Sequence, residues 1–142
     1  MKLPKELHDK LAGEFRIAAT RMTESDSPAE KLYYFSVLFG EATRVLNWHW
    51  DTELVLIWFA TQQTHNVIAG RQQSITQGEP IVRLTDAYFV ALTDAVLELA
   101  DYVEQEGNEQ QLLEIIGKFA ELAYFTTGNG YYLAQKGTFK VF

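Results

Sequence analysis

The fold of this chain is decided by residues 81–103, which read IVRLTDAYFVALTDAVLELADYV. Apolar side chains recur along this segment at spacings of three and four, which is the period of an α-helix. They form two adjacent stripes, Ile81, Leu84, Tyr88, Ala91 and Ala95, and Phe89, Leu92, Val96, Leu99 and Val103. A helix with two adjacent apolar stripes contacts more than one neighbour. The segment therefore predicts a helix inside an all-helical bundle.

Four further segments complete the predicted bundle. The expected helices span residues 4–22, 27–48, 52–77 and 109–127. The segment 27–48 is apolar on most of its surface, which predicts a central position for it. One narrow stripe on this segment is small or polar, and such a stripe lets another helix come close. Its members are Ser36, Gly40, Thr43 and Asn47.

Capping residues mark the expected ends of these helices. Ser27-Pro28-Ala29-Glu30 is a capping box with proline at the first helical position, and residues 108–111 form a second one. Asp51 or Thr52 can cap the helix that follows the second segment. Helix stops are expected at Gly78, Pro80, Gly107 and Gly128-Asn129-Gly130.

The connections between the expected helices are short, and short connections place successive helices antiparallel. No repeat, low-complexity tract or linker divides the chain. We therefore expect one all-α domain over residues 1–142, an up-down bundle of four to five long helices. A short extended C-terminal tail is expected at residues 138–142.

The charge of the chain disfavours two classes of partner. The net charge is -7, and no basic residue lies between Arg83 and Lys118. An acidic surface repels phosphate backbones and anionic lipids. The longest apolar run, residues 54–60, is too short to span a bilayer, and the charged segment 1–9 is unlike a signal peptide. We therefore expect no nucleic acid and no membrane among the partners, and a cytoplasmic location.

The residues that could hold a metal are few. The chain has no cysteine, which excludes disulfides, thiolate metal sites and cysteine nucleophiles. Its three histidines, His8, His49 and His65, lie on three different predicted segments. Neither the Glu-x-x-His pairs of di-iron bundles nor the His-Glu-x-x-His motif of zinc proteases occurs. We expect no metal site and no cofactor.

His65 is a candidate binding residue because it follows Thr61 and Thr64 on one predicted helix. These three side chains could form a polar pocket for a small molecule or a metal within the bundle. The alternative is a core histidine that is hydrogen-bonded to a threonine or to a backbone carbonyl.

Arg44 and His49 are candidate catalytic residues. An arginine followed by four residues and a histidine resembles the short signature of the HEPN ribonucleases, small all-helical domains that often dimerise. The resemblance implies an RNA-cleaving site in which arginine supplies charge and histidine transfers a proton. It covers two residues, and Val45 departs from the polar residue often found after the arginine. The alternative places Arg44 on the exposed edge of its helix and His49 in a turn between two tryptophans.

Aromatic residues make up 13% of the chain, more than the core of a five-helix monomer needs. Trp48, Trp50 and Trp58 are expected to fill the core near one end of the bundle. For the aromatics of the C-terminal segment, docking on a partner subunit and docking on the same chain both stay open. Surplus aromatics without catalytic spacing favour a non-enzymatic interaction or assembly protein. The expected partner is the chain itself, as a homodimer, or another protein.

Overall fold

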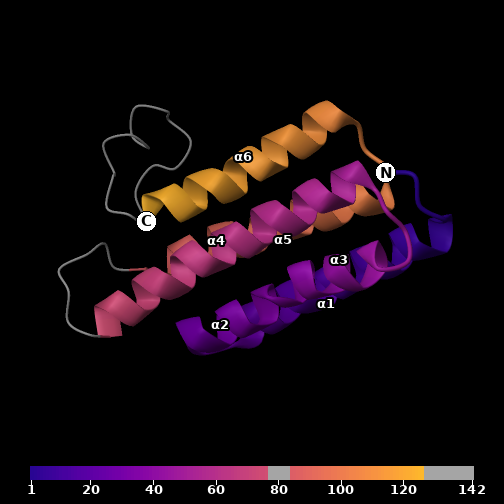
Figure 1. Ribbon diagram of the computed structural model, residues 1–142. Helices are drawn as coiled ribbons and strands as arrows, with labels where there is room; N and C mark the ends of the chain where they lie inside the picture. The colour runs from indigo at the N-terminus through magenta and orange to yellow at the C-terminus, as the bar shows by residue number, and fades with distance from the viewer. Residues whose placement is uncertain (77–83, 127–142) are drawn as a thin grey trace.

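The structure, a computed structural model, describes residues 1–76 and 84–126, without the side chains of residues 73–76. Six helices and no strand occur in these described ranges (Figure 1). The helices are α1 Lys5–Glu24, α2 Pro28–Phe35, α3 Val37–Leu46, α4 Thr52–Thr76, α5 Asp86–Glu104 and α6 Glu109–Phe125. The predicted all-α class is therefore confirmed.

The helices form an up-down bundle in which α2 and α3 together make one rod (Figure 1). The chain reverses direction after α1, α3, α4 and α5, so α4 and α6 run side by side in the same direction. The described part of the chain thus contains five long rods, as the spacing predicts. The expected tail at 138–142 and the stop signals at Gly78, Pro80 and Gly128-Asn129-Gly130 lie outside the described residues.

The expected helix 27–48 is interrupted at Ser36, between α2 and α3. The hydroxyl of Ser36 donates to the carbonyl oxygen of Tyr33. A serine side chain that bonds to the preceding turn competes with the helical hydrogen-bond ladder. The ladder continues on both sides, because Ser36 N–H donates to Leu32 and Ser36 accepts from Gly40. The interruption is therefore local, and the rod stays continuous.

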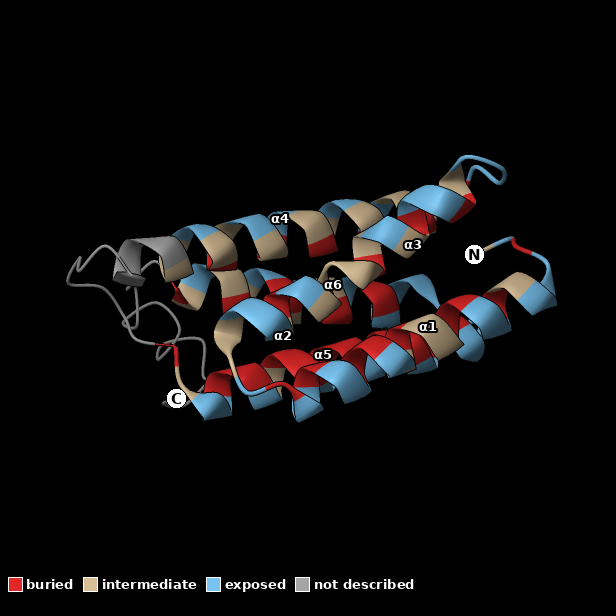
Figure 2. Ribbon diagram, turned by 90° about the horizontal axis from the view of Figure 1, so that it is seen from below, coloured by how far each residue is buried: buried red, intermediate tan, exposed pale blue. Residues whose placement is uncertain are grey.

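Helix α5 buries much of its surface in the bundle (Figure 2). It packs against α1 and α6, and both predicted stripes are buried where they fall within it, apart from the half-buried Ala91. The prediction that this segment contacts more than one neighbouring helix is therefore confirmed. The central position expected for 27–48 is wrong, since Tyr33 on that rod is exposed and Gly40, Thr43 and Arg44 on α3 face solvent. That rod carries more apolar side chains than its buried side can hold.

Within residues 1–76 and 84–126, no other helix packs on the stripe of small residues of α2–α3. Gly40, Thr43 and Asn47 are exposed, and a Cβ added at Gly40 would meet nothing within 4 Å. Small residues permit close approach, but they supply little apolar area to drive it. The expectation of close packing at this stripe is wrong.

Side-chain caps start four of the helices. Ser27 Oγ accepts from Glu30 N–H at 3.2 Å, and Asp51 Oδ1 accepts from Leu54 N–H at 3.0 Å. The box at residues 108–111 is complete, with each side chain bonded to the other residue's backbone. Helix α5 starts at a cap that the pattern did not reveal, because Thr85 Oγ1 accepts from Tyr88 N–H. The apolar repeat begins at Ile81, before this cap, so it predicts the start of the helix too early.

Helix α5 ends as predicted near Gly107, but the left-handed residue is its neighbour Glu106, at φ 52°. Gly107 N–H donates to the carbonyl of Tyr102 at 3.0 Å, which is the long-range bond of a Schellman motif. A Cβ on Gly107 would lie 2.5 Å from Cδ2 of Tyr102. Glycine is required here for close approach and not for its backbone freedom.

Candidate functional site

The predicted catalytic pair, Arg44 and His49, lies on the surface. Arg44 is near the end of α3, where its Nε and Nη2 atoms both donate to Oε2 of Glu41, at 2.9 and 2.8 Å. His49 is exposed in the connection between α3 and α4, and its backbone N–H donates to the carbonyl of Val45. The guanidinium is thus held by a carboxylate of its own helix. The ribonuclease interpretation stays a prediction.

The predicted pocket residues point to three different partners. Thr61 is buried, and its hydroxyl donates to the carbonyl of Ile57 at 2.7 Å on its own helix. The buried Thr64 donates to the carbonyl of Phe119 on α6. His65 turns instead toward the α2–α3 rod, where it contacts two phenylalanine rings. The two hydroxyls are therefore engaged by backbone carbonyls, and a shared pocket with His65 stays a prediction.

His65 sits in an aromatic setting. Its ring stacks on Phe35 at 6.3 Å between centroids with an interplanar angle of 5°, and it meets Phe39 edge-on at 5.3 Å. Burial lowers the pKa of His65, while hydrogen bonding to Asn66 and to the Leu32 backbone partly opposes this. The folded state therefore favours the neutral imidazole.

No group of three metal-ligating side chains occurs within the described ranges. His8 is fully buried on α1 and packs against the end of α5. Its Nδ1 lies 3.0 Å from the carbonyl oxygen of Val103, and its Nε2 lies 3.5 Å from Oε1 of Glu106. Nδ1 thus joins α1 to α5 by a hydrogen bond, while Nε2 has no hydrogen-bond partner within the described residues.

A polar cluster at the same end of the bundle was missed by the sequence analysis. Oε2 of Glu53 accepts hydrogen bonds from the amino group of Met1, at 2.7 Å, and from the hydroxyl of Tyr102. Oδ2 of Asp51 accepts from the N–H of Lys2 at 2.8 Å. Burial opposes ionisation of Glu53, but the two hydrogen bonds outweigh it and lower its pKa. These contacts fasten the residues before α1 to the start of α4 and the end of α5.

The acidic side of α5 is exposed to solvent. Arg16 on α1 forms ion pairs with Asp101 and Glu104, and Lys118 on α6 binds Glu98 at 2.6 Å. These cations tie the neighbouring helices to α5. The carboxylates form a solvated face with structural ion pairs rather than a ligand cluster.

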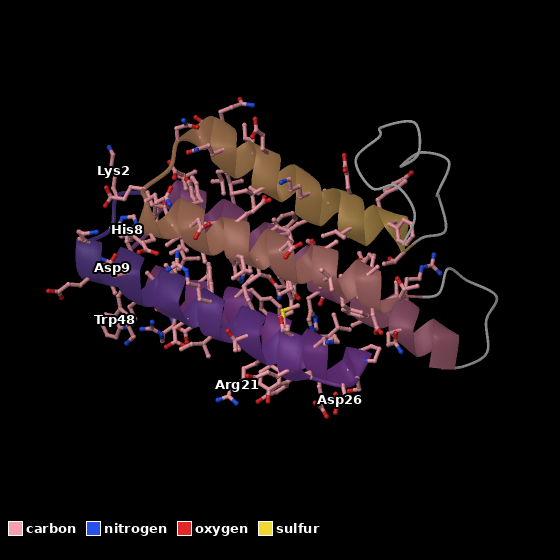
Figure 3. The ribbon with its side chains drawn as sticks, turned by 180° about the vertical axis from the view of Figure 1, so that it is seen from behind. Lys2, His8, Asp9, Arg21, Asp26 and Trp48 are labelled. Carbon is pink, nitrogen blue, oxygen red and sulfur yellow. The ribbon has the colours of Figure 1, made fainter. Side chains whose placement is uncertain are left out.

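Two of the three tryptophans are on the surface, which contradicts their predicted place in the core. Trp48 and Trp50 are 82% and 79% exposed. They lie in the connection between α3 and α4, outside the helical register that would turn them inward. Trp58, on α4, is packed against the core as expected. Figure 3 shows Trp48 at the same end of the bundle as Lys2 and His8.

An apolar groove lies between α4 and α6, with a volume of about 340 Å³. Phe59 and Tyr124 flank it with 55% and 42% of their surface exposed. Leu56 is exposed three residues before Phe59, and Leu113 is exposed three residues before Ile116, which lines the groove. We call the groove and these four exposed side chains the α4–α6 face. The groove is lined by Phe59, Ala60, Gln63, Thr64, Val67, Ile116, Ala120, Ala123 and Tyr124.

A weak signal for this face is present in the sequence. Phe59 and Leu56 fall in the apolar run 54–60, in which every side of the helix is apolar, so one side had to face outward or meet a partner. Which side it is depends on the packing of α4 against α3 and α6.

No protein-family model, no curated protein and no solved structure matches this chain. Within the described residues, none of the helices combines the length and the apolar character that crossing a membrane requires.

Proposed function

We propose that this chain is a non-enzymatic assembly protein that forms a homodimer in the cytoplasm through its α4–α6 face. The observation that carries this proposal is the apolar groove flanked by the exposed rings of Phe59 and Tyr124. Exposed aromatic and aliphatic side chains beside a concave apolar surface are typical of the centre of a protein interface.

The geometry of the face suits a second copy of the chain. Helices α4 and α6 run side by side (Figure 1), and the groove lies between residues 59–67 of α4 and residues 116–124 of α6. A two-fold axis across such a face would lay each protruding Phe59 ring against the groove of the other copy. The small residues Ala60, Ala120 and Ala123 leave room for an inserted ring.

The experiment is sedimentation of the purified chain over a range of concentrations. At high concentration the weight-average mass is expected to approach twice the chain mass of 16.2 kDa. The Ala60→Glu variant puts a charge into the groove and is expected to stay monomeric. Ala29→Glu adds the same charge at an exposed position on α2 and serves as the matched control. A parent chain that stays monomeric at high concentration would rule the proposal out.

The same preparation separates this proposal from the ribonuclease prediction. An enzyme built on Arg44 and His49 would cut single-stranded RNA, and the His49→Ala variant would not. The assembly proposal expects no cleavage by either protein. Cleavage that is lost with His49→Ala would show instead that the chain is a ribonuclease built on Arg44 and His49.

A further inference from the structure

The α4–α6 groove ends where the chain leaves α6. Ala123 and Tyr124 line the groove, α6 ends at Phe125, and Thr126 caps it. The segment 127–142 is therefore attached within one helical turn of the groove.

The composition of this segment complements the surface beside it. Residues 127–142 contain two lysines and no acidic residue, while residues 1–126 contain 10 basic and 19 acidic residues. The segment thus carries a charge of +2 next to a body of net charge -9. Opposite charge favours docking, and aromatic side chains supply the apolar area that a groove can bury. The aromatics are Tyr131, Tyr132, Phe139 and Phe142.

The segment is long enough to reach the groove. From Phe59 to Val67 the groove follows about 12 Å of helix, at about 1.5 Å per residue. An extended chain covers this distance in about four residues. Gly128-Asn129-Gly130 precedes the aromatics, and glycine and asparagine allow the positive φ angles of a tight reversal.

We infer that residues 131–142 dock into the α4–α6 groove of their own chain. The short tether makes the local concentration of the segment about millimolar, which favours its own groove over that of a second molecule. The docked segment covers the surface through which the proposed dimer forms. The segment therefore competes with dimerisation, and this competition rests on the proposed function.

Disulfide trapping tests the docking itself, and the natural chain has no cysteine to interfere. Gln63 is exposed and lines the groove, so Gln63→Cys is combined with Tyr132→Cys or with Phe139→Cys. Mild oxidation at low protein concentration is expected to give a disulfide within one chain. The pair Thr20→Cys and Tyr132→Cys is the control, because Thr20 is exposed on α1, which packs mainly against α5, α2 and α3.

Trapping overturns the inference if neither groove pair forms a disulfide, or if the disulfides join two chains. This result does not depend on the dimer. If the internal disulfide forms, but the chain without added cysteines and its Tyr131→Ser/Tyr132→Ser variant both stay monomeric, the proposed function is overturned and the docking is left intact.

Sedimentation tests the competition. The Tyr131→Ser/Tyr132→Ser variant keeps the full chain but weakens the docked segment, so its dimer is expected to form about tenfold more tightly. Adding Ala60→Glu to this variant is expected to abolish the tighter dimerisation. An unchanged or weaker dimer in the double serine variant shows that the segment does not compete.

Discussion

Nε2 of His8 lies 3.5 Å from Oε1 of Glu106, the residue whose φ of 52° turns the chain out of α5. His8 is on α1, so this contact joins the start of one helix to the C-terminal cap of another. The same cap brings Gly107 against Tyr102. The end of α5 is therefore where three kinds of constraint meet: a left-handed backbone, a buried histidine and a close glycine–aromatic contact.

Glu106→Gly is expected to raise the free energy of unfolding by about 1 kcal/mol, because glycine adopts a positive φ without the penalty of a side chain. The lost carboxylate contributes little, since 53% of the Glu106 side chain is exposed. Glu106→Ala separates the two effects: it removes the carboxylate and keeps the unfavourable backbone. Urea unfolding of both variants measures the difference. Equal stabilities would show that the backbone at this position is not strained.

Gly107→Ala is expected to lower the free energy of unfolding by about 1–3 kcal/mol, because the added Cβ would overlap the ring of Tyr102 and Oε1 of Gln111. Gly117→Ala is the matched change on α6, where a Cβ meets nothing within 4 Å. That variant is expected to gain about 0.5–1 kcal/mol from the higher helix propensity of alanine. Thermal and urea unfolding should therefore move in opposite directions for the two variants. A shift in the same direction would contradict the placement of Gly107.

Tyr102→Phe removes a hydrogen bond to the carboxylate of Glu53 and is expected to cost about 1.5 kcal/mol at neutral pH. The lowered pKa of Glu53 means that its contribution is present above the ordinary value of 4.5 and is lost as the pH falls through the folded value. The deficit of the variant should therefore shrink in acid. Tyr88→Phe is the control, because Tyr88 donates to the neutral carbonyl of Leu122. Its deficit should not shrink with the protonation of a carboxylate.

His65 is expected to titrate in the folded protein with a midpoint below its ordinary value of 6.5, because burial lowers its pKa. The unfolded chain then binds the proton more readily, so stability falls as the pH drops below 6.5 toward the folded value. Proton NMR of the imidazole follows the titration directly. His65→Gln should reduce the loss of stability over this range. A midpoint at or above 6.5 would show that the ring is not shielded by Phe35 and Phe39.

Local sequence was a good guide to the helices of this chain and a poor guide to their surroundings. The spacing of Tyr88, Leu92 and Val96 predicts a buried helix, and Asn108 predicts a helix start, because each signal acts within one or two turns. The tryptophans show where prediction from nearby residues fails. Trp48 and Trp50 are as apolar as core residues, yet their exposure depends on where α3 stops and α4 begins.

The candidate sites depend even more on contacts between distant residues. The sequence places Thr61, Thr64 and His65 on one helix, but their partners come from α4 itself, α6 and the α2–α3 rod. The cluster around Glu53 joins residues about fifty positions apart. No residue close in sequence to Glu53 predicts that its carboxylate meets Met1 and Tyr102.

The sequence by itself determined the helical class, the up-down order and the acidic character of this protein, since period, caps, short connections and charge are properties of nearby residues. The tertiary structure alone decided that α5 packs between α1 and α6, that Glu106 and His8 meet, and that the α4–α6 face points outward. The physical reason is that the burial of a residue depends on the neighbouring helices as well as on its own helix. An apolar side chain is sheltered only where a neighbouring helix covers it, and that depends on how all the helices pack at once.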